Sequence, residues 1–486
     1  MNLVDRLPTA GAIALVEPGG RHVSFDALRR DADRIARGLR GRLAPGTPVV
    51  LMQPIGVDLY RMLAGLLAAE LPAVLVDPAA GLLRMRAVIA GVGAGAVMGP
   101  ALAQGLRCLV PGLRFGVAAP GGWFAADLDR LDGAAFSRSD TCVDTPALIS
   151  FTTGSTGRPK ALARRHGLLD AQRVVLGEHL GVGSDDVDLA TLPVFALSSL
   201  AAGARVVLAD CDLRRPGAAD GRRIAAQIEA AGVTTCTASP AFFRQIVDTG
   251  VVSPRVRAVF TGGARVSASL LAGMCRAFPN ARVEVVYGSS EAEPIAALDA
   301  RAHLALLDAG EADGRGALVG AAVVGARVRV THIGAAADVS DGEAGEVLVH
   351  GAHVSPSYWK DPVADAVSKL RDADGRVWHR TGDVARRDAD GRLWLLGRVG
   401  EDVAGVWPFP VEAAAERVDG VRRAALLASG GEPVLVVEGD ADDAALRARA
   451  GVARVVKVAR IPVDRRHNAK VDRPALRQAL RGTLEA

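Results

Sequence analysis

The stretch that most constrains this chain reads Ser150-Phe151-Thr152-Thr153-Gly154-Ser155-Thr156-Gly157-Arg158-Pro159-Lys160. It begins within an apolar run, residues 147–151, that has the character of a buried strand, and it passes at once into glycines and hydroxyl residues. Glycines let a backbone approach an anion, N–H groups and hydroxyls can donate to it, and the final lysine adds positive charge. The spacing is not that of a Walker loop. A flexible surface linker is the alternative, but the position after a strand favours a phosphate-binding loop.

Outward from this loop, short apolar runs alternate with longer amphipathic stretches. The strand-like runs are residues 49–52, 73–76, 147–151, 205–208, 256–260 and 283–287, and the helical stretches include residues 221–231 and 267–278. Alternation of this kind is typical of parallel sheets covered by helices. From about residue 318 to residue 396, short β-like runs separated by turns indicate an antiparallel addition to that sheet structure.

After residue 396 the pattern changes again. Strand-like runs occupy residues 424–427, 434–438 and 452–458, and helical ones occupy residues 441–450 and 474–484. We therefore predict an α/β protein. Its large N-terminal domain, residues 1–396, consists of stacked mixed sheets with helices, and a small α+β domain covers residues 397–486.

The composition excludes several classes of protein. The chain has 486 residues, 50% of them hydrophobic and 23% charged, with a formal net charge of +4. This balance gives no support to a nucleic-acid surface, and no apolar run is long enough to span a membrane. The N-terminus has no basic leader before an apolar segment, and the five cysteines form no CxxC pair, so we expect a cytoplasmic protein. His166, His350 and His353 lack metal-ligand spacing and are expected in loops or at the surface.

Lysine is unusually scarce. The sequence contains it only at Lys160, Lys360, Lys369, Lys457 and Lys470, whereas arginine supplies the other 53 basic residues. Where a sequence with this bias still uses lysine, a compact ammonium group is indicated in place of a planar guanidinium.

Further motifs follow the loop in order. They are Thr261-Gly262-Gly263-Ala264, Tyr287-Gly288-Ser289-Ser290-Glu291, Gly345-Glu346-Val347-Leu348-Val349-His350-Gly351 with Tyr358, Arg380-Thr381-Gly382-Asp383, Gly397-Arg398 and Lys470-Val471-Asp472-Arg473. With the loop, they resemble the motifs of the adenylate-forming (AMP-binding) enzymes, which include acyl-CoA synthetases, luciferases and nonribosomal-peptide adenylation domains. The resemblance spans nearly the whole chain, and it implies that the domain of residues 397–486 is mobile. Thr153 and Ser290 stand where the family usually has Ser and Thr, and Ala161 and Ala469 where it usually has Gly.

The resemblance implies an adenylate-forming ligase. Such an enzyme activates a carboxylic acid, here a fatty or β-hydroxy acid, with ATP and Mg²⁺, releases pyrophosphate and forms an acyl-AMP. The acyl group then passes to a thiol, either that of CoA or that of phosphopantetheine on an acyl carrier protein. The implied partners are thus a small acid and a carrier protein, with no nucleic acid.

The resemblance also implies roles for individual residues. The β- and γ-phosphates of ATP would be held by Thr152, Thr153, Gly154, Ser155, Thr156, Gly157 and Lys160. The adenine side would be formed by Gly262, Gly263, Ala264, Tyr287 and Gly288. Asp383 would accept the ribose hydroxyls, and Arg398 would lie at the hinge near ribose and phosphate. The implied catalytic residues are Lys470, which bridges the attacking carboxylate and the α-phosphate, Ser290, which donates to the α-phosphate, and Glu291, which holds Mg²⁺.

Two departures bear on the second step. Ala196, in Leu192-Pro193-Val194-Phe195-Ala196-Leu197, stands where the family often has histidine, and residues 399–408 lack the Lys-x-x-Gly loop that helps to admit a thiol. Both departures resemble one branch, the β-lactone synthetases, whose C-terminal motif is similar to Pro462-Val463-Asp464-Arg465-Arg466-His467-Asn468-Ala469-Lys470. In that branch the substrate's own β-hydroxyl closes a ring as AMP leaves.

Two alternatives therefore stand beside thiol transfer. One is β-lactone formation. The other is a degenerate, non-catalytic nucleotide-binding relative that serves as a partner protein. The presence of Lys160, Glu291, Asp383 and Lys470 favours an enzyme.

Overall fold

The computed structural model describes residues 2–9, 11–76, 81–119, 121, 125–134, 143–153, 159–464 and 470–485. The chain forms two compact units. The first unit comprises Met1–Asp210, Ser290–Glu293 and Ala352–Lys369, and the second comprises Cys211–Ser289, Pro294–Gly351 and Leu370–Ala486. The domain boundary at residue 396/397 stays a prediction.

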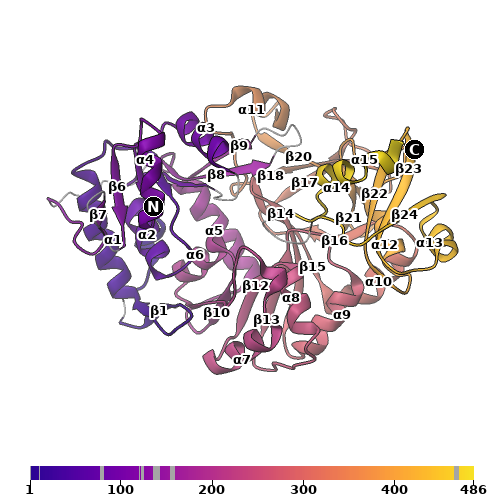
Figure 1. Cartoon of the computed structure of the whole chain (residues 1–486), viewed down its shortest axis with the longest axis horizontal. Coiled ribbons are helices and arrows are strands. Elements are labelled where there is room, and N and C mark those ends of the chain that lie inside the picture. Colours follow the sequence, from indigo (N-terminus) through magenta and orange to yellow (C-terminus); the bar gives the residue numbers. More distant parts are fainter. Residues whose placement is uncertain are drawn as a thin grey trace. The chain divides into compact units, whose positions relative to one another are not determined.

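Two groups of strands build the first unit (Figure 1). A seven-stranded sheet has the order β7 (Ala126–Asp127), β6 (Phe115–Ala118), β5 (Ala96–Met98), β3 (Val49–Leu51), β4 (Ala73–Leu75), β8 (Pro146–Thr153) and β9 (Pro159–Arg165). Its neighbours are parallel except for the antiparallel pair β8–β9. The second group has the order β10 (Val187–Ala190), β11 (Arg205–Leu208), β1 (Ile13–Val16) and β2 (His22–Ser24).

Helices of the first unit bury apolar faces against these strands. They are α1 (Phe25–Arg40), α2 (Val57–Ala68), α3 (Leu82–Val92), α4 (Leu106–Leu109), α5 (His166–Leu180), α6 (Pro193–Ala201) and α11 (Pro362–Ser368), with the 3-10 turns η1 (Leu3–Arg6) and η3 (Ala101–Gly105). Helix α1 begins where the Ser24 hydroxyl accepts from the backbone N–H of Ala27. Its residues Leu28, Ile35 and Leu39 recur at helical spacing and are fully buried.

The second unit contains a long mixed sheet. Its strands lie in the order β17 (Arg327–Thr331), β18 (Gly345–His350), β20 (Val377–Arg387), β21 (Leu393–Arg398), β16 (Ala317–Ala322), β15 (Ala292–Asp299), β14 (Arg282–Ser289), β13 (Ala258–Gly262) and β12 (Thr235–Ala238), and β19 (Lys369–Arg371) pairs with β20. Strands β12, β13 and β14 are parallel, whereas the pairs β17–β18, β18–β20, β20–β21 and β21–β16 are antiparallel. The helices beside this sheet are α7 (Gly221–Ala231), α8 (Pro240–Val247), α9 (Ala268–Ala277) and α10 (Ala300–Ala312), with the 3-10 turn η4 (Pro216–Ala218).

The end of the chain adds a small sheet to the second unit. Strands β22 (Val421–Ser429), β23 (Glu432–Gly439) and β24 (Arg454–Val458) form it, with helices α12 (Pro408–Ala415), α13 (Asp443–Ala450), α14 (Arg473–Ala479) and α15 (Arg481–Glu485). Each face of the sheet has its own apolar cluster, one around Leu426 and Leu435 and the other around Leu427 and Val436.

The structure confirms the predicted α/β class and the change from parallel to antiparallel pairing, and it corrects two details. The single helix expected at residues 474–484 is two helices, because Leu480 leaves helical geometry between them. His166 begins helix α5 and is buried, contrary to the expectation of a loop or surface position. His353 lies in a turn, as expected for a loop residue, although its side chain is buried. Burial lowers the pKa of His166 to about 4, so this imidazole is neutral at physiological pH.

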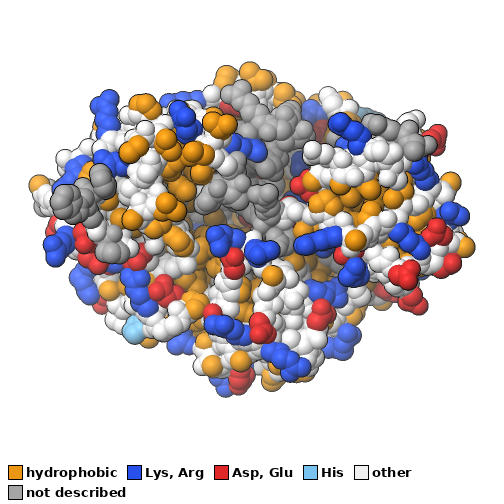
Figure 2. Space-filling view, in the orientation of Figure 1, with side chains coloured by type: hydrophobic (Ala, Val, Ile, Leu, Met, Phe, Trp, Pro, Cys, Tyr) orange, Lys and Arg blue, Asp and Glu red, His pale blue; other side chains and the backbone are white. Residues whose placement is uncertain are grey.

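No helix in the described part of the chain is both long and apolar enough to cross a bilayer. On the face shown in Figure 2, basic and acidic side chains are interspersed and form no continuous basic area. This pattern fits the small net charge of the sequence.

Candidate active site

A tyrosine and a carboxylate meet in the second unit, at the carboxyl end of a parallel strand. Tyr287 lies near the end of β14, and its hydroxyl donates to Asp383 Oδ2 over 2.7 Å. Asp383 lies on β20 directly opposite Arg398 of β21, and Arg398 Nε is 3.5 Å from Asp383 Oδ1. Burial, followed by the Asp383 charge, raises the pKa of Tyr287 well above its usual value, so the phenol remains a donor. Both oxygens of Asp383 are therefore oriented.

The glycine motif ends the neighbouring strand β13. Gly262 pairs with Val286, and a Cβ on Gly262 would lie 2.1 Å from the Val286 carbonyl oxygen, so only glycine fits there. Gly263 follows with a φ of +81°, in the left-handed region, and the chain turns away from the sheet. Strand β13 thus ends beside β14, the strand that carries Tyr287.

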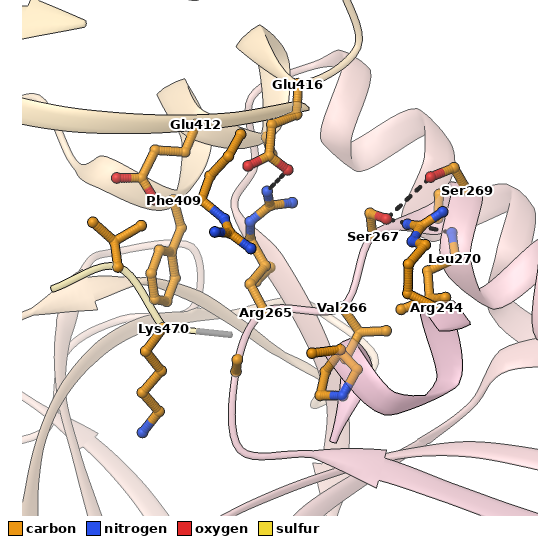
Figure 3. A pocket seen from close by; sticks show the side chains of 18 of the residues that line it. Arg244, Arg265, Val266, Ser267, Ser269, Leu270, Phe409, Glu412, Glu416 and Lys470 are labelled. Atoms are coloured by element: carbon orange, nitrogen blue, oxygen red, sulfur yellow. Dashed lines mark hydrogen bonds and ion pairs between the residues drawn. The ribbon is translucent and has the colours of Figure 1, made fainter. Parts of the chain in front are cut away.

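The second unit contains a cavity of about 1810 Å³, and Figure 3 shows the part of its lining around Arg265, Glu416 and Lys470. Of the predicted residues, its lining includes Gly263, Ala264, Tyr287, Gly288, Asp383, Arg398 and Lys470. Arginine is the commonest charged residue in the lining. The volume and the positive charge suit a nucleotide, and the oriented Asp383 carboxylate suits a ribose diol.

Lys470 lines the same cavity, and hydrogen bonds with Asp464 hold its backbone. Its backbone N–H donates to Asp464 Oδ1 over 2.9 Å, and the backbone N–H of Asp464 donates to the Lys470 carbonyl oxygen over 2.8 Å. Val463 and Val471 form a bridge beside them. Figure 3 shows the Lys470 side chain extending away from Glu412. Residues 465–469 lie outside the described part of the chain.

The sequence did not predict a network of charges along the same cavity. Arg265, which follows the glycine motif, pairs with Glu416 and lies 3.5 Å from Glu311. Glu412 pairs with Arg473 and accepts a hydrogen bond from the backbone N–H of Leu426. Burial raises the pKa of Glu412 to about 7, even though Arg473 opposes that shift. No sequence signal could have found this network, because single Arg and Glu residues are too common.

A second cluster of predicted residues lies in the first unit. Lys160 stands on β9 opposite Thr152 of β8, so the hairpin returns the lysine to the end of the buried strand. Lys160 Nζ donates to Ser368 Oγ over 3.1 Å and lies 5.2 Å from the centre of the Tyr358 ring. The Tyr358 hydroxyl donates to Glu291 Oε1 over 2.8 Å, and Glu291 is buried.

Ser290, next to Glu291, is held through its backbone. Its carbonyl oxygen accepts from Arg164 Nη2 over 2.8 Å, and Arg164 Nη1 donates to Ser150 Oγ over 3.0 Å. Strand β8 therefore connects to the Ser290–Glu291 turn through one arginine. Gly154, Ser155, Thr156 and Gly157 lie outside the described residues, and for Thr152 and Thr153 only the backbone is described.

The residues around Glu291 fit a Mg²⁺ ion carried by a nucleotide. No group of three or more His, Cys, Asp or Glu side chains poised to hold a metal occurs among the described residues. Mg²⁺ commonly binds one or two carboxylates together with substrate phosphates and waters, so a single buried carboxylate suffices. The Tyr358 hydroxyl occupies one oxygen of Glu291, and this bond orients the carboxylate.

Comparisons with known proteins place the chain among similar sequences and folds. The family described as AMP-binding enzyme matches residues 5–359. The olefin beta-lactone synthetase of Xanthomonas campestris is 34% identical over 524 residues, covering 96% of this chain and 94% of that protein. The olefin beta-lactone synthetase of Stenotrophomonas maltophilia is 33% identical, covering 98% and 97%. ATP-bound MatB from Rhodopseudomonas palustris has the same fold, with a TM-score of 0.84, 21% identity and 100% of both chains covered.

Proposed function

Because this chain belongs to the AMP-binding enzyme family, we propose that it activates a carboxylic acid with ATP, forms the acyl-AMP and releases pyrophosphate. The resemblance to the adenylate-forming enzymes and to their β-lactone branch is confirmed, and the chain is an adenylate-forming enzyme. The observation that carries the proposal is the cavity in which the oriented Tyr287–Asp383 pair and Lys470 occur together.

For the nucleoside, the chain supplies a carboxylate, that of Asp383, in a fixed orientation. Asp383 accepts hydrogen bonds from the ribose hydroxyls, while Tyr287 and Arg398 fix its two oxygens. A fixed carboxylate loses little freedom when it binds, so its hydrogen bonds contribute fully to affinity. Gly263, whose φ of +81° favours glycine, has no side chain and so lets the adenine approach the backbone.

On the reacting side, the chain supplies positive charge. A carboxylate oxygen attacks the α-phosphorus, and the bond from that phosphorus to the leaving pyrophosphate breaks, so two anions must be held together. Lys470 places its ammonium group between the carboxylate and the α-phosphate. It stabilises charge that develops in the transition state, where an electrostatic contact contributes most to the rate.

The Lys160 cluster is assigned to the phosphates. Lys160 contacts the β- and γ-phosphates with the loop from Thr152 to Gly157, Ser290 donates to the α-phosphate, and Glu291 holds Mg²⁺. The ion neutralises phosphate charge when it is bound. The hydrogen bond from Tyr358 to one oxygen of Glu291 fixes the direction of the carboxylate.

For the second step, the family resemblance supports transfer to a thiol of CoA or of a phosphopantetheine carrier protein. The acyl-AMP is a mixed anhydride, and a thiolate displaces AMP from its carbonyl carbon. The substrate would be a fatty or other small carboxylic acid.

A second candidate for that step is β-lactone closure, and the loop after β21 favours it. Val403 and Val406 exchange two backbone hydrogen bonds of 3.0 and 2.9 Å, so Ala404 and Gly405 form a closed two-residue turn. A Lys-x-x-Gly loop for a thiol arm is absent from this sequence. Ala196 is fully buried on α6, and a histidine in its place would overpack that site.

Similarity supports the same candidate. The relatives that are 33–34% identical over nearly their full length are named olefin beta-lactone synthetases. A β-hydroxyl is already tethered to the activated carbonyl, so it can attack at a high effective concentration once its geometry is enforced. The oxygen–carbonyl bond forms, the bond from the carbonyl carbon to AMP breaks, and the hydroxyl proton is released.

A panel of carboxylic acids assayed for ATP-dependent pyrophosphate release tests the first step. At least one acid should stimulate release, and a chain that releases none with any acid would be the non-catalytic relative. Matched acids with and without a β-hydroxyl, each incubated with and without CoA, then separate the second steps. Lactone and AMP formed without CoA support ring closure, whereas thioester from both acids, with AMP release only when CoA is present, supports thiol transfer.

A further inference from the structure

The proposed function assigns roles to two of the five lysines, Lys160 and Lys470. A third, Lys369, lies beside Lys160. Lys369 follows α11 directly, and its Nζ lies 5.3 Å from the centre of the Tyr358 ring, at nearly the same distance as Lys160 Nζ. The chain uses arginine for 53 of its 58 basic residues, so the presence of two lysines against the same aromatic ring needs a physical explanation.

The backbone around Tyr358 connects the two proposed phosphate-side groups. We call residues 354–359 the bridging segment. On one side, Val354 bridges to Ala292 and the Ser355 N–H donates to the Glu291 carbonyl oxygen over 2.7 Å. On the other side, the Trp359 N–H donates to the carbonyl oxygen of Ala161, the residue after Lys160, over 2.7 Å. The position of the bridging segment therefore sets the position of Glu291.

Lys369 holds this segment at two points. Its Nζ donates to the Ser355 carbonyl oxygen over 2.6 Å, and the same ammonium group lies over the Tyr358 ring. Ser355 holds the Glu291 backbone and Tyr358 holds the Glu291 side chain, so Lys369 contacts both supports of that carboxylate. A compact ammonium can make both contacts at once, which a planar guanidinium with fixed donor directions does less well.

The position is costly for a cation. Burial lowers the pKa of Lys369 to about 8, against the attraction of Glu291 and Asp365. Asp365 also accepts the Tyr358 backbone N–H over 2.7 Å, so it belongs to the same cluster. An apolar side chain at position 369 would avoid the cost of burying a charge. That the sequence has lysine there indicates that the ammonium group is needed at this position.

We propose that Lys369 is a positioning residue that fixes the direction of the Glu291 carboxylate, and hence its hold on Mg²⁺, through Ser355 and Tyr358. The inference rests on the proposed function, because the ion is the one that accompanies ATP. Nothing in the sequence motifs assigns a role to Lys369, which was distinguished only by the scarcity of lysine.

The test uses the full-length chain and Mn²⁺ as a paramagnetic substitute for Mg²⁺. Lys369→Met keeps the length of the stem and removes the ammonium group, and Tyr358→Phe keeps the ring and removes the hydrogen bond to Glu291. Electron paramagnetic resonance measures Mn²⁺ affinity in the presence of the non-hydrolysable α,β-methylene analogue of ATP. Both variants should weaken Mn²⁺ binding by about tenfold or more, the usual effect of removing a partner of a metal ligand. Calorimetric binding of ATP in EDTA should change by less than about twofold.

The matched control is Lys360→Met. Lys360 is exposed, and its ammonium group lies over the ring of Trp359, the residue that follows Tyr358. This variant should bind Mn²⁺ as the wild type does, and Lys369→Arg should recover part of the lost affinity.

A purely structural role would lower the melting temperature of Lys369→Met while leaving Mn²⁺ affinity unchanged, and that result would overturn the proposal. So would normal Mn²⁺ affinity in Tyr358→Phe, a variant that keeps the shape of the ring if Lys369→Met fails to fold. Failure of the proposed function has a different signature. The wild-type chain would release no pyrophosphate with any acid, whatever its affinity for Mn²⁺.

Discussion

Asp383 shows how neighbouring side chains give a carboxylate a defined role. Taken alone, an Asp in a Thr-Gly-Asp stretch would most often be a solvated surface group. Here the Tyr287 hydroxyl and the Arg398 guanidinium each engage one of its oxygens, and all three line the cavity. The orientation comes from register, because Asp383 and Arg398 stand opposite each other on adjacent strands.

Asp383→Ala should weaken ATP binding by about ten- to a hundredfold. Each hydrogen bond to a charged acceptor contributes about 1.5–3 kcal/mol, and the ribose loses the only carboxylate assigned to it. Calorimetric titration with ATP measures the change. Asp390→Ala is the matched control, since Asp390 is an exposed carboxylate in the turn between the same two strands. Equal affinities for the two variants would contradict the role given to Asp383.

Lys470→Ala should lower the rate of adenylation by on the order of a hundredfold or more, because a contact made chiefly in the transition state contributes several kcal/mol. ATP affinity should change little, since the assigned nucleotide contacts lie elsewhere. Pyrophosphate release measures the rate. Lys457→Ala is the control, because Lys457 lies on β24 and pairs with Asp443 over 3.0 Å. Normal release in Lys470→Ala would refute the assignment.

At the residue scale, the sequence predicted the identities of these groups better than their surroundings. The ordered motifs indicated Tyr287, Asp383 and Lys470, and the structure brings them to one cavity. The sequence could not show that Tyr358 donates to Glu291 or that Lys369 holds Ser355. These contacts depend on how residues 354–369 pack against distant parts of the chain, and no local pattern encodes that packing.

At the scale of elements, the turn after β21 departs most clearly from the family pattern. Ala404 adopts a φ of +51° and Gly405 a φ of +81°, as the two central residues of a type I′ turn require. A left-handed conformation costs an alanine roughly 1–2 kcal/mol, whereas glycine adopts it freely.

Ala404→Gly should therefore stabilise the protein by about 0.5–1 kcal/mol, after allowance for the greater freedom of glycine in the unfolded chain. Urea unfolding measures the change. The control is Ala445→Gly, within the regular helix α13, where glycine should destabilise by about 1 kcal/mol. Loss of stability in Ala404→Gly would show that the turn does not adopt this geometry in solution.

Helix α12 carries a titratable group that makes stability depend on pH. Burial raises the pKa of Glu412 from 4.5 to about 7. Between these values the folded chain keeps a proton that the unfolded chain has released, so the free energy of unfolding falls as pH rises through this window. Gln at this position carries no charge at any pH. Relative to the wild type, Glu412→Gln should thus gain stability between pH 4.5 and 7, by on the order of 3 kcal/mol.

Urea unfolding of both proteins at pH 5 and pH 8 measures this difference. Glu432→Gln, a change at an exposed position on β23, should follow the wild type at both pH values. A constant difference between Glu412→Gln and the wild type across the window would contradict the assigned shift.

The periodicity of the sequence predicted whether a segment is a helix or a strand more reliably than it predicted where the segment begins and ends. The run at residues 221–231 became α7 with the same bounds, because Asp220 caps its first turn and Gly232 ends it in a left-handed conformation. The run at residues 474–484 became two helices, since the apolar pattern continues across Leu480 while the backbone does not.

At the scale of the whole molecule, the sequence predicted the class of fold because strand and helix signals alternate over most of the chain. The grouping into two compact units was not predicted. Residues 290–293 and 352–369 pack with the N-terminal part although they are distant from it in sequence. That grouping places Glu291, Tyr358 and Lys369 together with Lys160, an arrangement that depends on contacts between remote segments.

The central claim is that this chain joins an acid to AMP. Exchange of labelled pyrophosphate into ATP measures that step most directly, because it requires a reversible acyl-AMP and is independent of how the acyl group leaves. We predict acid-dependent exchange by the wild-type chain with Mg²⁺ and without any thiol, reduced by about a hundredfold or more in Lys470→Ala. Absence of exchange with every acid, in a protein that binds ATP, would contradict the account.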